Sequence, residues 1–177
     1  QIQRALLRFG VYLYWFPDVT PATEHFEAVQ FMSARGYFPD ERFEPQAPLT
    51  RGEAVRVLLI LLREFRPDLP EERFQGLAFT DVLFGHPYAV PVQNLFLLGV
   101  LERTENRRFN PDEPVKRRDF VRWLIRALAL LEPNEWQPIQ GQPSPFVDVP
   151  SDDPDLPFLA LLYARRFSPV IWDGFEA

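Results

Sequence analysis

The sequence predicts a mainly α-helical fold made of tandem helix-loop-helix repeats. One observation is that segments of the form Phe-x-Asp-Val begin at Phe16, Phe79 and Phe146, which are 63 and 67 residues apart. A second is that Phe-x-Pro segments begin at Phe43 and Phe109, which are 66 residues apart. Because two separate series share one period, the pattern indicates duplicated structural units.

Each unit is expected to start with a short helix after the Phe-x-Asp-Val segment. In the first unit Phe26, Val29 and Met32 recur at helical spacing, and Gly36 supplies a C-cap. Gly99 has the corresponding place in the second unit, whereas the third unit has no such glycine. The predicted first helices cover residues 22–35, 88–98 and 156–165.

A second, more apolar helix is expected in each of the first two units, at residues 50–65 and 116–131. In the later one, Arg118, Arg122 and Arg126 recur every four residues. We expect these arginines to form a solvent-facing stripe opposite an apolar face. Proline-rich segments then stop each helix and link one unit to the next.

The helix predicted at 50–65 starts with the pattern of a capping box. Thr50 and Glu53 are three residues apart. The hydroxyl can therefore accept from the Glu53 amide, while the carboxylate accepts from the Thr50 amide. Asp119 stands at the place of Glu53 in the second unit, and we expect it to have the same structural role.

Taken together, these markers resemble the S-layer homology module, a family recognised by Thr-Arg-Ala-Glu after a hydrophobic residue. Leu49-Thr50-Arg51-Gly52-Glu53 matches with one change, and the second unit has Lys116-Arg117-Arg118-Asp119. The resemblance implies that the modules pack about a pseudo-threefold axis. It also implies grooves between neighbouring modules that hold cell-wall polysaccharide, which is often pyruvylated.

The resemblance covers most of the chain as two near-complete modules and a partial third. Residues 16–78 are expected to be the first module with its linker, 79–145 the second with its linker, and 146–177 the partial third. Residues 1–15 are expected to be the tail of a preceding helix or an N-terminal helix. The start at Gln1 fits either a mature chain after signal cleavage or a fragment of a larger protein.

Arg51 is the main candidate for ligand binding. Capping does not require it, because the helix macrodipole slightly disfavours a cation at the N-terminal end. Its planar guanidinium can instead bind a carboxylate of a pyruvyl ketal, a uronic acid or a neighbouring module. Arg117 stands at the corresponding place beside Lys116, and both are candidate contacts too. An equally weighted alternative is a structural salt bridge from Arg51 to Asp18 or Asp81.

Other repeated residues are expected to be structural. The aspartates of the Phe-x-Asp-Val segments are expected to cap a helix or a turn rather than contact a ligand; they are Asp18, Asp81 and Asp148. A series of phenylalanines is expected to fill the core rather than stack on sugar rings; its members are Phe43, Phe109 and Phe175.

Composition and motifs argue against several function classes. A net charge of −6 disfavours nucleic acid, which needs a basic surface. The apolar run at residues 57–62 is far shorter than the roughly 20 residues of a membrane span. The chain has no cysteine and none of the common catalytic motifs, so no enzyme, cofactor or metal is expected. The acidic segment 148–155 lacks EF-hand spacing and is expected to be a solvated loop.

The sequence therefore predicts an exported, non-catalytic module that anchors a larger protein to the bacterial cell envelope. Its expected partner is a cell-wall polysaccharide or a peptidoglycan-linked polymer. The alternative is a degenerate module that acts as a scaffold for protein-protein contacts in an envelope or membrane-associated complex. High aromatic content, including Trp15, Trp123, Trp136 and Trp172, favours that alternative.

Overall fold

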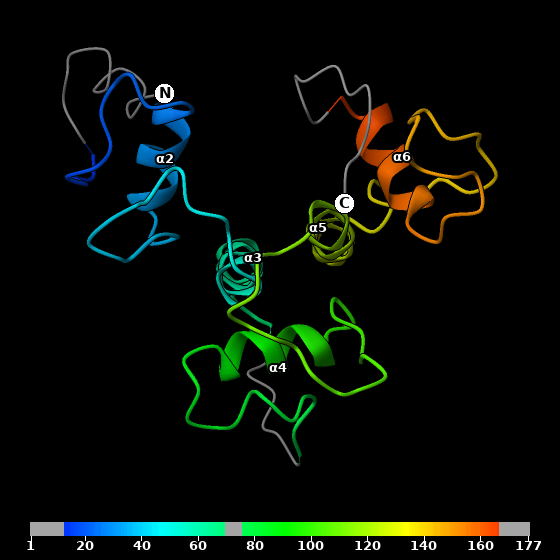
Figure 1. Cartoon of the computed structure of the whole chain (residues 1–177), viewed down its shortest axis with the longest axis horizontal. Coiled ribbons are helices and arrows are strands. Elements are labelled where there is room, and N and C mark those ends of the chain that lie inside the picture. Colours follow the sequence, from blue (N-terminus) through cyan, green and yellow to red (C-terminus); the bar gives the residue numbers. More distant parts are fainter. Residues whose placement is uncertain (1–12, 70–75, 167–177) are drawn as a thin grey trace. The chain divides into compact units, whose positions relative to one another are not determined.

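The computed structural model describes residues 13–69 and 76–166 (Figure 1). Over these ranges the chain forms five α-helices and no β-strand apart from an isolated bridge between Thr50 and Pro114. The mainly α-helical prediction is confirmed, and the pseudo-threefold packing stays a prediction. The helices are α2 (Phe26–Ser33), α3 (Arg51–Phe65), α4 (Ala89–Leu97), α5 (Arg117–Leu131) and α6 (Leu156–Ala164).

Two compact units make up the chain, Gln1–Pro48 and Leu49–Ala177. The described part of the first unit has a small core around Phe16, Val19 and Val29. The second unit contains two larger apolar clusters. One involves α3, α4 and one side of α5, and the other involves the opposite side of α5 together with α6.

Packing in the second unit is offset from the sequence repeat. Helix α3 contacts α4, and α5 contacts α6. Each second helix therefore packs on the first helix of the following repeat. Helix α5 also contacts α3, so Trp123 and Ala127 enter one core while Val121 and Ile125 enter the other. This double burial leaves α5 little surface for a solvent-facing stripe.

The first helices of the repeats start at corresponding sequence positions. Helices α2, α4 and α6 begin at Phe26, Ala89 and Leu156, with the same spacings as the Phe-x-Asp-Val segments. Gly36 and Gly99 end α2 and α4 with positive φ angles of 80° and 74°. This left-handed conformation suits glycine at a helix C-terminus. Helix α6 has no such glycine, and Arg166 takes a φ of 50° at the corresponding place.

Helix α2 is shorter than the predicted range 22–35. Before it, the Thr20 amide donates to Thr23 Oγ1 at 2.9 Å, and the Thr23 amide donates to the Thr20 carbonyl at 2.8 Å. These two bonds hold residues 20–23 in a turn instead of a first helical turn. His25 then precedes the helix with a φ of 57°, which breaks helical geometry.

The aspartate of Phe-x-Asp-Val binds the Phe-x-Pro segment in both complete repeats. Asp81 accepts from the amides of Phe109 and Asn110 at 2.8 and 2.7 Å. Asp18 does the same with Phe43 and Glu44 at 3.2 and 2.7 Å. Each carboxylate therefore caps a turn more than 20 residues away, in agreement with the turn alternative. Phe109 is buried, Phe43 is partly buried, and Phe175 lies outside the described residues.

Helix α3 starts with the capping box that the sequence predicts. Thr50 Oγ1 accepts from the Glu53 amide at 3.2 Å, and the Glu53 carboxylate accepts from the Thr50 amide at 2.9 Å. Gly52, which lies just before Glu53, faces the ring of Tyr88 so closely that a Cβ atom would clash with it. Glycine therefore lets α3 approach the residue that precedes α4.

Candidate functional site: a groove beside Arg51

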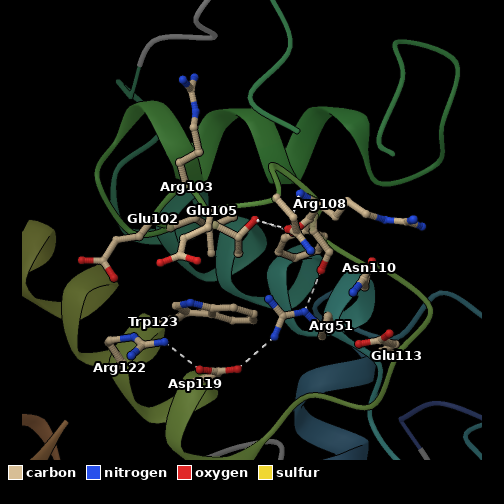
Figure 2. A pocket seen from close by; sticks show the side chains of 14 residues that line it. Arg51, Glu102, Arg103, Glu105, Arg108, Asn110, Glu113, Asp119, Arg122 and Trp123 are labelled. Carbon is tan, nitrogen blue, oxygen red and sulfur yellow. Dashed lines mark hydrogen bonds and ion pairs between the residues drawn. The ribbon is translucent and has the colours of Figure 1, made fainter. Parts of the chain in front are cut away.

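A groove of about 600 Å³ opens in the second unit (Figure 2). The start of α3, the loop 101–113 and the first two turns of α5 form its walls. The lining residues are Arg51, Leu101, Glu102, Arg103, Thr104, Glu105, Asn106, Arg108, Phe109, Asn110, Glu113, Asp119, Arg122 and Trp123.

Arg51 is held on several sides by the groove wall. Its Nε donates to the Phe109 carbonyl at 2.8 Å, and Nη1 donates to Asp119 Oδ2 at 2.9 Å. The guanidinium carbon lies 4.9 Å from the ring centroid of Trp123, which allows a cation-π contact. The backbone amide of Arg51 also donates to the Glu113 carbonyl. Arg51 thus joins α3 to the next repeat.

The carboxylate partner of Arg51 differs from both partners that we expected. Asp119 takes that place, whereas Asp81 binds the backbone of the Phe-x-Pro turn. Asp18 binds the equivalent turn in the first unit. A salt bridge from Arg51 to Asp18 or Asp81 is therefore wrong, whereas the alternative of a carboxylate in a neighbouring module agrees with Asp119. The bond links two repeats because Asp119 lies 68 residues further along the chain.

Asp119 does not have the capping role that we expected. Lys116 is the N-cap of α5 and makes no side-chain cap, because an ammonium group cannot accept an amide hydrogen. The Asp119 carboxylate instead binds Arg51 through one oxygen and Arg122 through the other, the latter at 2.6 Å. Figure 2 shows the three side chains in a row beside Trp123.

The arginine stripe of α5 is paired rather than solvent-facing, so this prediction is wrong. Arg118 binds Asp153 at 3.0 Å, Arg122 binds Asp155 at 2.5 Å, and Arg126 binds Glu102 at 2.6 Å. The acidic segment 148–155 is only partly the solvated loop that we expected, since Asp148 and Asp152 are exposed whereas Asp155 is only 3% exposed. Alternating charges therefore run from Arg51 through Asp119 and Arg122 to the start of α6.

The other two candidate contacts lie outside this groove. Lys116 and Arg117 are exposed at the start of α5, and neither lines the groove. Trp123, Asn106 and Asn110 do line it and were not selected from the sequence. The only sequence signal for these three residues is that they lie close to the Phe-x-Pro segment or to the motif of α5. That signal does not distinguish a residue that lines the groove from one that lies in the core.

The lining carries balanced charge. Four guanidinium groups belong to Arg51, Arg103, Arg108 and Arg122, and four carboxylates belong to Glu102, Glu105, Glu113 and Asp119. Hydroxyl and amide groups from Thr104, Asn106 and Asn110 complete the polar wall. This mixture of donors and acceptors suits a hydroxyl-rich ligand such as a sugar.

The described residues include no cluster of three or more histidine, aspartate and glutamate side chains placed to hold a metal ion. Among the described helices, none has the length and apolar character needed to cross a membrane.

Comparison with known proteins gives a consistent family. Residues 16–55 and 78–121 match the S-layer homology domain. Cell surface glycoprotein 1 of Acetivibrio thermocellus is 29% identical over 69% of this chain. The aligned region is 5% of that protein, so the chain spans only a small part of its length. These matches confirm the predicted resemblance.

Proposed function

Because residues 16–55 and 78–121 are S-layer homology repeats, we propose that this chain is a non-catalytic anchoring module that binds a bacterial cell-wall polymer. The observation that carries the proposal is the groove beside Arg51. Arg51 comes from the first matched segment, and most of the remaining lining comes from the second. Ligand binding at this place requires two adjacent repeats.

Residues from 146 onward are, in this proposal, a partial third repeat. Support comes from α6, which begins 67 residues after α4 and packs on α5 as α4 packs on α3. A pseudo-threefold arrangement of the repeats is the packing that this family would give. Lys116 and Arg117 then form a second proposed contact surface at the start of α5, at the place that corresponds to Thr50 and Arg51.

Arg51 also has a structural role in the proposed site. Its guanidinium uses two donors on Phe109 and Asp119, which fixes the groove wall. The remaining donors of its planar fork are available in chemical terms for a ligand oxygen. A pyruvylated sugar was the ligand expected at this residue. The acid group of such a sugar would have to compete with the Asp119 carboxylate.

The test is co-sedimentation of the purified chain with cell-wall sacculi, before and after chemical removal of their accessory polysaccharide. We expect binding that disappears with the polysaccharide. Glu113→Trp should abolish binding, because Glu113 lines the groove through an exposed side chain. Asp112→Trp is the matched control, since Asp112 is exposed and lies outside the lining. Equal binding by both variants would place the polymer elsewhere.

A protein-protein scaffold is the second candidate, favoured by exposed apolar side chains on the second repeat. Leu83, Phe84, Val90 and Leu97 are between 48% and 67% exposed. In the first repeat the corresponding residues are Thr20, Pro21, Glu27 and Ala34, which are small or polar. This function would be favoured if the folded chain does not bind sacculi but is recovered in a complex with an envelope protein.

A further inference from the structure

The two repeats use the fourth residue of their motif differently. In the first repeat, the Glu53 carboxylate is held by the hydroxyl of Thr50 at 2.7 Å and by its amide at 2.9 Å. In the second repeat the residue corresponding to Thr50 is Lys116, which provides no hydroxyl. The carboxylate of Asp119 is therefore not engaged in a capping box.

Because Asp119 does not cap the helix, its carboxylate can neutralise the arginines of the groove wall. Its two oxygens bind Arg51 at 2.9 Å and Arg122 at 2.6 Å, and all three side chains line the groove. The side chains of Arg51 and Asp119 are only 16% and 19% exposed. Such a partly buried, charge-assisted pair is screened less than a surface pair.

A ligand acid group would meet a guanidinium that is already neutralised. Arg51 has donors that Phe109 and Asp119 do not use, but an acid group bound to them would lie close to the Asp119 carboxylate. Two like charges would then share one guanidinium in a partly buried place, which is costly. Two other arginines of the lining are engaged elsewhere. Arg103 extends away from the Arg51 and Asp119 pair in Figure 2 and lies over the ring of Phe96, and Arg108 faces Asp81 at 3.8 Å.

We infer that Asp119 sets the ligand class of this groove. It neutralises Arg51, so the groove takes uncharged, hydroxyl-bearing sugar residues and discriminates against acidic ones. The inference rests on the proposed function, because it concerns the chemistry of the same groove. It assigns Asp119 as the specificity-determining residue and Arg51 as a positioning residue.

The test uses two probes of the same shape and different charge. One is a methyl galactoside with a 4,6-linked pyruvyl ketal, and the other is its methyl ester. Binding is measured by calorimetric titration at low salt. The natural chain should not favour the acid over the ester. Asp119→Asn should bind the acid about tenfold more tightly than the natural chain does, since the guanidinium loses its internal counter-ion.

A second variant introduces a capping box at the start of α5 and keeps a carboxylate at position 119. It combines Lys116→Thr with Asp119→Glu, and the longer carboxylate at position 119 should turn back to the hydroxyl introduced at position 116, as Glu53 turns to Thr50. The same gain in acid binding is expected, with a melting temperature at least equal to that of the natural chain. Asp112→Asn, outside the lining, is the control and should change neither quantity.

Two results would overturn the inference. One is a clear preference of the natural chain for the acid, and the other is no gain in acid binding by either variant, including no binding at all. The nitrogen-15 NMR signal of Arg51 Nε reports whether the guanidinium stays bound to Phe109 in each variant. Failure of the natural chain to bind sacculi is a separate result, which would refute the proposed function instead.

Discussion

Replacing Asp81 by asparagine tests how the two motif series of a repeat are joined. The Asp81 side chain is 14% exposed and accepts two backbone hydrogen bonds, from Phe109 and Asn110. Hydrogen bonds to a charged group each contribute about 1.5–3 kcal/mol. Asparagine keeps one acceptor and turns its NH₂ group toward the other amide. We therefore expect the free energy of unfolding to fall by about 2–3 kcal/mol.

The effect should depend on pH in a defined direction. Desolvation raises the pKa of Asp81, but the amides of Phe109 and Asn110 outweigh it, and the pKa lies below its ordinary value. A carboxyl with a lowered pKa stabilises the fold above its unfolded pKa, near 4, and loses that contribution as the pH falls through its folded pKa. The difference between natural chain and variant should be constant above about pH 5 and shrink below about pH 4.

Urea unfolding followed by tryptophan fluorescence at a series of pH values measures this difference. Asp18→Asn is the matched variant, because Asp18 makes the same two bonds in the first unit. Its effect should be smaller, since one of its bonds is longer, at 3.2 Å. A difference for Asp81→Asn that stays unchanged down to about pH 2.5 would refute the assignment of the stabilisation to the ionised carboxylate.

The remaining predictions concern the same unit. Gly52→Ala should lower the free energy of unfolding by about 1–3 kcal/mol, because its Cβ would clash with Tyr88; Tyr88→Ala in the same chain should reduce that loss, as urea unfolding would show. Thr50→Ala should cost about 1 kcal/mol through the lost capping box, and Thr50→Ser should restore most of it. Asp155→Asn should cost about 2–3 kcal/mol, because Arg122 and Arg118 lose a buried partner. The last loss should change little in about 1 M NaCl, because salt screens a buried ion pair much less than an exposed one.

Helices and turns were predictable because their signals are local. The apolar period, the capping box at Thr50 and the glycines at 36 and 99 each act within a few residues. These signals placed α3, α4 and α6 to within one residue at each end. The start of α2 was misplaced, because Thr20 and Thr23 form a competing local turn.

The candidate site was less predictable because its contacts join distant residues. Arg51 can be singled out from the sequence because the capping box does not explain it, and its role as a ligand contact stays a prediction. Its partner Asp119 lies 68 residues away, and many carboxylates are equally good candidates at that separation. The period of Arg118, Arg122 and Arg126 indicated one common face, which is correct. A period alone does not say whether that face meets water or the acidic segment that precedes α6.

The offset between packing and repeat has a consequence for how such a chain can be divided. Each second helix completes the core of the repeat that follows it, as α3 does for α4. Excision of residues 79–145 as one sequence module would remove α4 from α3 and leave both apolar faces uncovered. A cut between Pro48 and Leu49 keeps each core whole. The boundaries of the sequence repeat are therefore different from those of the parts that pack together as one core.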